Sequence, residues 1–76
     1  MNDSRRKRLS LASAKISETT ALLEEVRDEE QDSLDSLPEA VMAGEKGEAM
    51  ETTISILDDA INSLAEALSS IEEAQI

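Results

Sequence analysis

Cysteine, histidine and all three aromatic residue types are missing from this chain of 76 residues. Without cysteine and histidine there is no disulfide, no thiolate nucleophile, no imidazole base and no conventional zinc or Glu-x-x-His di-iron ligand set. The first part of the chain is rich in serine and threonine, but a hydroxyl nucleophile needs a base beside it. The remaining possibility is a serine–lysine pair with Lys15, and no motif supplies an oxyanion hole. We therefore expect no enzymatic activity, no cofactor and no metal.

Long apolar runs are also missing. No stretch approaches the roughly 18–20 residues that a membrane span needs, and the segment after the basic start is too short and polar for a secretory core. We expect a soluble, cytoplasmic protein that does not enter a membrane. The whole chain, residues 1–76, is the size of one domain, and its leucines, isoleucines and valines form a small core for a lone monomer. Self-association is therefore expected.

Charge is divided unevenly along the chain, whose formal net charge is −11. Residues 1–15 hold five cations against the single acid Asp3, and residues 16–76 hold two cations against seventeen acids. The acidic part repels nucleic acid and attracts basic partners, whereas the first turns form a cationic patch.

Apolar or small residues recur at alternating spacings of three and four between residues 9 and 37, which is the pattern of a helix with one buried stripe. Leu22 and Leu34 lie beside this stripe and widen it. One of residues 2–4 is the expected N-cap, and we predict a helix over residues 4–35. The predicted seam consists of Leu9, Ala12, Ile16, Thr19, Leu23, Val26, Glu30, Ser33 and Leu37.

A second seam repeats the three–four spacing without interruption and is the strongest pattern in the chain. It predicts a helix over residues 46–74. Between the two helices, Pro38, Gly44 and Gly47 predict a turn over residues 36–47, with room for one short helical turn that begins at the proline. The second seam consists of Met50, Ile54, Leu57, Ile61, Leu64, Leu68 and Ile71.

Two helices of similar length joined by a short turn predict an all-α fold, an antiparallel two-helix hairpin of the coiled-coil type. One hairpin covers only part of each apolar stripe, so we expect two copies to assemble as a homodimeric four-helix bundle, with a higher helical oligomer as the alternative. The residues expected in the core or in the oligomer contacts are Leu9, Ile16, Leu23, Val26, Ile54, Leu57, Ile61, Leu64, Leu68 and Ile71.

A dense acidic run in the first helix is the leading candidate for partner binding. Helical neighbours three and four residues apart place charges about 5–6 Å from one another, so a rod of acids resembles a nucleic-acid backbone to a protein that binds polyanions. Acids on one helix do not wrap around a cation, so no metal site is expected, and a merely solubilising face is the alternative. The candidate residues are Glu24, Glu25, Asp28, Glu29, Asp32 and Asp35.

The basic start of the chain is a second candidate site. Its cations are suited to phosphates of a nucleotide or nucleic acid, although no aromatic residue is present for base stacking. The alternative is electrostatic pairing with acids inside the oligomer. The residues are Arg5, Arg6, Lys7, Arg8 and Lys15.

Four stretches of the chain resemble a group of short phage and prophage proteins: EEVRDEEQ at 24–31, LDSLPE at 34–39, GEKGEAME at 44–51 and LDDAI at 57–61. A weaker similarity is to the helical-hairpin sponges by which phages sequester cyclic nucleotides. The resemblance implies a phage-type protein in the host cytoplasm that binds and inhibits a host protein, from a defence system or a nucleic-acid-handling machine, through its acidic surface. Two alternatives remain. In the first, the basic patch binds a small anion, as in a sponge, or contacts nucleic acid. In the second, the chain is a structural or assembly factor of the phage particle.

Overall fold

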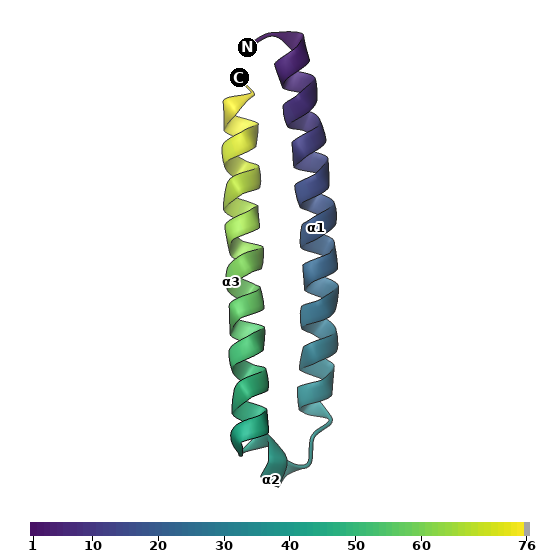
Figure 1. The fold of residues 1–76 in the computed structure, drawn as a ribbon, viewed down its shortest axis with the longest axis vertical. Coiled ribbons are helices and arrows are strands. Elements are labelled where there is room, and N and C mark those ends of the chain that lie inside the picture. Colours follow the sequence, from purple (N-terminus) through teal and green to yellow (C-terminus); the bar gives the residue numbers. More distant parts are fainter. Residues whose placement is uncertain (76) are drawn as a thin grey trace.

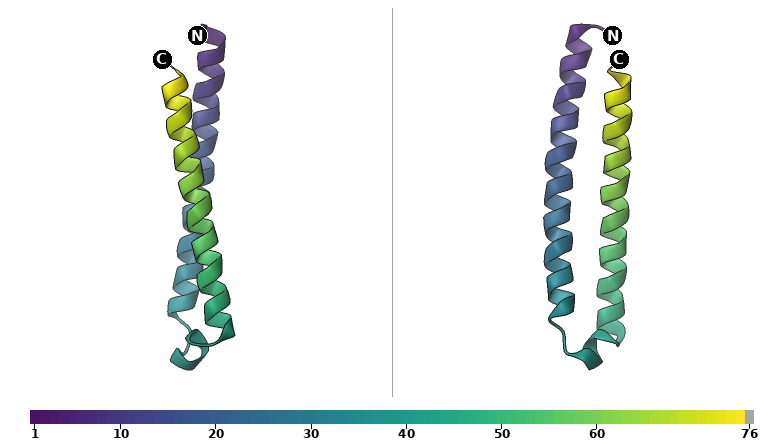
Figure 2. Two further views of the ribbon diagram at one scale, coloured as in Figure 1. Left: turned by 90° about the vertical axis from the view of Figure 1, so that its left-hand side faces the viewer. Right: turned by 180° about the vertical axis from the view of Figure 1, so that it is seen from behind.

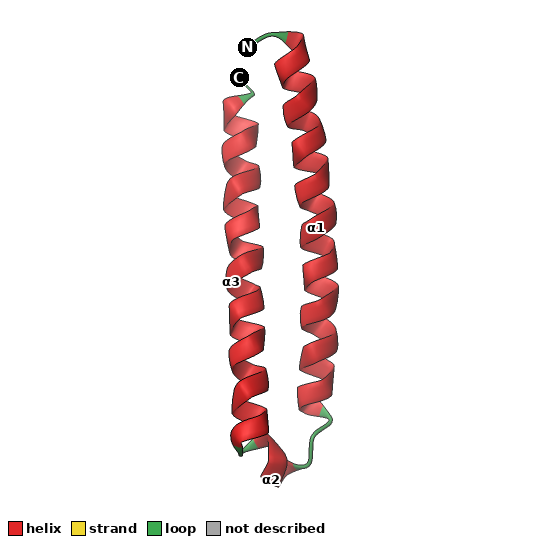
Figure 3. Ribbon diagram, in the orientation of Figure 1, coloured by secondary structure: helices red, strands yellow, loops and turns green. Residues whose placement is uncertain are grey.

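The computed structural model describes residues 1–75 and is a helical hairpin (Figure 1). Its elements are α1 (Asp3–Asp35), α2 (Glu39–Met42) and α3 (Glu45–Ala74). The two long helices run antiparallel, so the start of α1 and the end of α3 lie side by side at the end opposite α2. Loop residues are confined to the turn and the two chain ends (Figure 3). The predicted hairpin is confirmed, and both long helices begin and end within one residue of the expected positions.

Local hydrogen bonds explain where the first helix begins and ends. The Asn2 side chain accepts a hydrogen bond of 2.8 Å from the backbone N–H of Arg5 and so caps α1. At the other end, the hydroxyl of Ser36 donates to the Asp32 carbonyl at 2.8 Å. Pro38, two residues further on, has no N–H to continue the helix. The chain therefore leaves α1 where the sequence predicts.

The turn is built around α2 and a close backbone approach. The Pro38 carbonyl accepts the N–H groups of Val41 and Met42, both at 2.9 Å, which closes one helical turn. Gly47, in the first turn of α3, is buried against the backbone of Met42. A Cβ atom at Gly47 would lie 2.8 Å from the Met42 Cα and closer still to the Met42 carbonyl. The absence of a side chain at Gly47 is thus what allows α3 to begin directly beside α2.

The packing register of α3 follows the sequence pattern. Every residue of the predicted second seam, from Met50 to Ile71, is buried or half-buried against α1, and Ile61 is the most buried of them at 9% exposure. The seam extends by one position at each end, to Gly47 and Gln75, with the same alternation of three and four.

The packing register of α1 differs from the predicted one. Of the predicted seam, Leu9, Ile16, Leu23, Glu30 and Leu37 lie at the interface as expected. Ala12 is half-buried as well, as is its neighbour Ser13. In contrast, Thr19, Val26 and Ser33 are exposed, and Thr20, Arg27 and Leu34, each one residue later, lie against α3 in their place. Val26 is 42% exposed and contributes no core to the single chain, whereas Leu34, expected beside the seam, is 5% exposed and the most buried side chain.

The hairpin has a thin interior for its size. It measures 58 × 15 × 11 Å, with a radius of gyration of 17.3 Å, against roughly 11 Å for a compact domain of this length. Its accessible surface is 5433 Å², compared with about 4,500 Å² for a typical folded monomer of this mass. Leu34 and Ile61 are the only buried hydrophobic residues among those that the structure describes. Two long helices that cross at a shallow angle, with no third layer, leave most side chains at the surface (Figure 2).

Candidate functional site

The seven-residue repeat divides the surface of the hairpin into faces, because side chains seven positions apart lie in one row. Two observations show which rows of α1 and α3 are neighbours. Arg27 pairs with Asp58 at 3.1 Å across the two helices. A shallow hollow of about 300 Å³ lies between the helices, on the same side of the hairpin as the Arg27–Asp58 pair. Its lining residues are Ser17, Thr20, Ala21, Glu24, Ala65 and Leu68.

Acids from both helices gather on this side, toward the turn. We call this surface the acidic face. In the single chain, all of its members are exposed except Asp58, which is half-buried. The exposed carboxylates are therefore accessible to a partner protein. It consists of Glu24, Asp28 and Asp35 from α1, and Glu48, Glu51 and Asp58 from α3.

Arg27 is the cation within the acidic face, and its side chain bridges the two helices there. Its guanidinium donates to Asp28 at 3.0 Å and to Asp58 at 3.1 Å. The hydrogen bonds to Asp28, and next the one to Asp58, raise the pKa of Arg27 above its ordinary value. The side chains of Asp28 and Asp58 remain 68% and 47% exposed. The ion pairs therefore neutralise only part of a surface that stays open to solvent.

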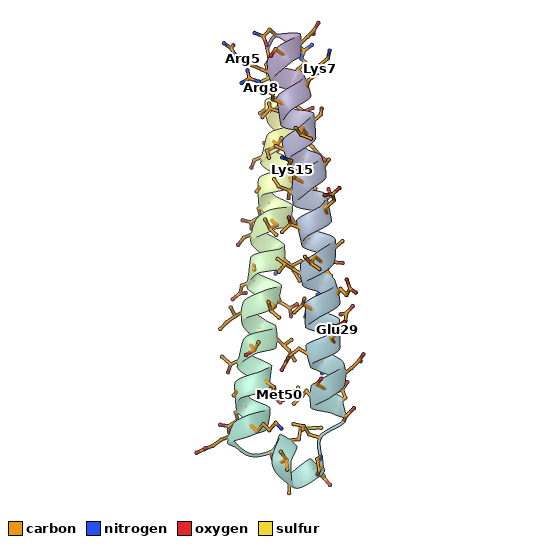
Figure 4. The ribbon with its side chains drawn as sticks, turned by 45° about the vertical axis from the view of Figure 1, so that its right-hand side comes forward. Arg5, Lys7, Arg8, Lys15, Glu29 and Met50 are labelled. Atoms are coloured by element: carbon orange, nitrogen blue, oxygen red, sulfur yellow. The ribbon has the colours of Figure 1, made fainter. Side chains whose placement is uncertain are left out.

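The predicted acidic residues do not all lie together. Glu24, Asp28 and Asp35 belong to the acidic face, whereas Glu25 and Asp32 lie on the outer ridge of α1, the row farthest from α3. Glu29 falls in a row on the opposite side of the hairpin, and its side chain points away from α3 (Figure 4).

The acids that α3 contributes escaped prediction. Glu48, Glu51 and Asp58 lie far from the acidic run in sequence, and only the antiparallel return of the chain brings them beside it. The available signal is positional: Glu51 and Asp58 lie in the row that borders the second seam on this side, and Glu48 lies in the next row out.

The predicted basic residues lie at the N-terminal end of α1, with Lys15 further along the helix (Figure 4). Arg5 and Arg8, together with Met1 and Leu9, line an open hollow of about 370 Å³. Lys7 lies on another side of the helix in Figure 4, so the structure does not bring all these cations into one pocket. The C-terminal end of α3 lies beside this tract (Figure 1). Its partial negative charge compensates cations that are unfavourable at the N-terminus of their own helix.

The side of the hairpin opposite the acidic face is nearly free of acids. We call it the acid-poor face. It carries three exposed aliphatic side chains: Leu22 (59% exposed), Val26 (42%) and Ile56 (61%). Glu29 is the one acid in these rows within residues 1–75. The rows consist of Arg5, Ala12, Thr19, Val26 and Ser33 with Arg8, Lys15, Leu22 and Glu29 in α1, and of Lys46, Thr53, Ala60, Ala67 and Ala74 with Ala49, Ile56, Ser63 and Ser70 in α3.

Neither a metal site nor a membrane span is found within residues 1–75. No group of three or more acidic side chains is arranged to hold a metal ion. No helix in this part of the chain combines the length and the apolar character that crossing a membrane requires.

Comparison of the chain with protein-family models, with curated proteins and with solved structures finds no match.

Proposed function

We propose that this chain is a non-enzymatic interaction protein that assembles as a homodimeric four-helix bundle and binds a basic surface of a partner protein through its acidic face. The observation that carries the proposal is the convergence of exposed acids from α1 and α3 on one side of the hairpin, with Arg27 as their cation. A face of this kind has a strong negative potential, and it is presented on a rigid rod.

The spacing of these acids favours a partner that ordinarily binds nucleic acid. Charges along each helix recur every one or two turns, and the two antiparallel helices present two such rows side by side. A groove that is complementary to a phosphate backbone cannot easily reject such an array. In the phage setting that the sequence resemblance implies, the partner is a host nucleic-acid-handling or defence protein, and occupation of its groove inhibits it.

Self-association is supported by the thin interior of the hairpin. Leu34 and Ile61 alone are buried among the hydrophobic residues of the described chain, and three aliphatic side chains are exposed together on the acid-poor face. Covering them with a second hairpin gives each helix a second neighbour, as in four-helix bundles. The acidic faces of both copies then remain outside.

The test compares two variants with the same change in charge. The first reverses Glu24, Asp28, Asp35 and Glu51 of the acidic face to lysine, and the control reverses Glu18, Asp59, Glu66 and Glu73 of the outer ridges. Each is immobilised and exposed at low salt to host lysate, and bound proteins are identified by mass spectrometry, with circular dichroism to verify that both variants are helical.

We expect the unmodified chain to retain proteins that heparin displaces, the first variant to lose them and the control to keep them. If both variants lose them equally, net charge alone is responsible, and if neither does, the acidic face is not the binding surface.

The hollow between Arg5 and Arg8 supports a second candidate function, the binding of a small anion or nucleotide. Two guanidinium groups border it, and Met1 and Leu9 give it an apolar wall. Calorimetric titration with cyclic nucleotides and short oligonucleotides tests this function directly. Heat that disappears in an Arg5→Ala, Arg8→Ala double variant supports it, and the absence of heat with every ligand excludes it.

A further inference from the structure

The acid-poor face has a charge pattern that is complementary to itself. Lys15 and Glu29 lie in the same row of α1 as Leu22, one seven residues before it and the other seven residues after it. Within one chain these two charges are about 21 Å apart along the helix axis, at 1.5 Å per residue, so they cannot pair with each other. Neither belongs to an ion pair within residues 1–75.

From this symmetry we propose that two copies pack through their acid-poor faces with α1 antiparallel to the partner's α1 and a two-fold axis at Leu22. The proposal rests on the self-association proposed above and specifies its geometry. A two-fold axis at Leu22 brings Lys15 opposite Glu29 of the partner subunit, and the same pair recurs on the other side of the axis. Leu22 then meets Leu22 of the partner subunit at the centre.

The occupant of this face is a second copy because of where the charges lie. The chain carries a net charge of −11, so two copies repel each other least when their contact surface carries few acids. The acid-poor face meets this condition, and its one acid, Glu29, is matched by a lysine. In this packing the acids of both acidic faces and both sets of outer ridges point into solvent. The small residues Ala60, Ser63 and Ala67 of α3 allow close approach of the partner's α3.

A second two-fold arrangement is geometrically available, and the charges disfavour it. In that arrangement both turns lie at the same end, and α1 faces the partner's α3. The Arg27–Asp58 pair fixes which residues lie at the same level of the hairpin. Counting from it, Glu29 would face the partner's Ile56 and Lys15 would face the partner's Ser70. Both charges would lose water without gaining an opposite charge, which is unfavourable.

The two symmetric ion pairs select the register more than they hold the dimer together. Exposed pairs contribute only about 0.2–1 kcal/mol each. The burial of Leu22, Val26 and Ile56, which are 59%, 42% and 61% exposed in the single chain, is the main source of affinity. Polar pairs at defined positions are a common way in which helical assemblies exclude alternative registers.

Cysteine cross-linking tests this geometry cleanly because the chain has no cysteine of its own. Single Leu22→Cys and Ser63→Cys variants are each treated with a short bismaleimide, alone and as an equimolar mixture. Leu11→Cys, on the outer ridge and 55% exposed, is the matched control.

We expect both Leu22→Cys and Ser63→Cys to yield covalent homodimers and Leu11→Cys to stay monomeric on denaturing gels. Cross-linking only in the mixture would establish the second two-fold arrangement and overturn the proposal. Equal cross-linking of Leu11→Cys would show that the products come from random collisions and would likewise overturn it.

Charge exchange provides an independent readout by analytical ultracentrifugation. Lys15→Glu or Glu29→Lys alone should raise the dimer dissociation constant roughly tenfold, since each change replaces two attractions by two repulsions. The Lys15→Glu, Glu29→Lys double variant should restore it to within about threefold. No recovery in the double variant contradicts the proposed pairing.

These outcomes separate this proposal from the one on which it rests. If the unmodified chain sediments as a monomer at micromolar concentration, self-association itself fails. If it sediments as a dimer but Leu22→Cys does not cross-link, only the two-fold axis at Leu22 fails. Neither result affects partner binding through the acidic face, which is measured with variants of other residues.

Discussion

The close approach of α3 to the short helix α2 makes the two glycines of the turn respond in opposite directions to substitution. Gly47→Ala adds a Cβ atom that would lie 2.8 Å from the Met42 Cα and in severe overlap with the Met42 carbonyl. The overlapping atoms belong to the backbone, so no side-chain rotation relieves the clash. Either α2 moves away from α3, or the first turn of α3 unwinds.

The expected size of the effect follows from two opposing terms. Overpacking in a closely packed site typically costs about 1–3 kcal/mol. Alanine is favoured over glycine within a helix by about 0.5–1 kcal/mol, which offsets part of that cost. Combined, these terms allow a loss of up to about 2.5 kcal/mol. Because the overlap is with backbone atoms, we expect Gly47→Ala to lower the free energy of unfolding by about 1–2 kcal/mol, a fall in melting temperature of roughly 4–16 °C for a domain of this length.

Gly44 provides the matched control in the same turn. A Cβ atom at Gly44 would have ordinary contacts of 3.6 Å, and this residue caps α3 without any side-chain hydrogen bond. Gly44→Ser supplies the missing acceptor and should raise stability by a few tenths of a kcal/mol.

The assay is urea titration and thermal unfolding followed by far-ultraviolet circular dichroism, with all variants at one protein concentration because association shifts the apparent stability. A Gly47→Ala variant as stable as the unmodified chain would show that α2 does not lie against α3. A loss of stability in Gly44→Ser equal to that in Gly47→Ala would show that the turn is sensitive to any substitution.

Three further substitutions test the packing of the hairpin. Ser13→Ala should stabilise the chain by up to about 1 kcal/mol, because the Ser13 hydroxyl is buried without a hydrogen-bond partner. If urea denaturation instead shows a loss of stability of similar size, the hydroxyl has a hydrogen-bond partner in solution. Leu34→Ala should cost about 2–3 kcal/mol, since Leu34 is 5% exposed, and Leu11→Ala, at 55% exposure, should change stability by less than about 0.5 kcal/mol; similar melting temperatures for the two variants would contradict the observed register. Arg27→Leu should leave the stability equal or slightly higher, because an apolar seam residue replaces partly exposed ion pairs; a clear loss of stability in the same assay would show that the ion pair to Asp58 is structurally essential.

The hairpin itself was predictable from local chemistry. The uninterrupted three–four spacing of Met50 to Ile71 determines both the existence of α3 and the side that it buries. Pro38 and the two glycines place the turn, and a polar side chain before the first helix supplies its cap. These features act over a few residues along one helix, so they are readable without knowledge of the partner helix.

The register of α1 was not predictable in the same way. Its sequence offers two seams that share Leu9, Ile16 and Leu23, and the one that was predicted contains Val26 where the real one contains Arg27. In its middle the predicted seam is more apolar than the observed one, because it contains valine where the observed seam contains arginine. Packing against α3 selects the seam that contains Arg27, because Arg27 forms an ion pair with Asp58 across the interface and Leu34 is buried near the turn.

The same choice of register determines how charge is distributed around the hairpin. From the sequence alone the acidic residues of α1 form one run and the acids of α3 are scattered. The antiparallel return places Glu48, Glu51 and Asp58 beside the part of α1 that carries Asp28 and Asp35, and it collects small and aliphatic residues on the opposite side. The sequence by itself thus determined that this chain is an acidic helical hairpin, because periodicity and turn chemistry are local properties. Only the tertiary structure decided which residues share a face, because that depends on how two distant helices pack.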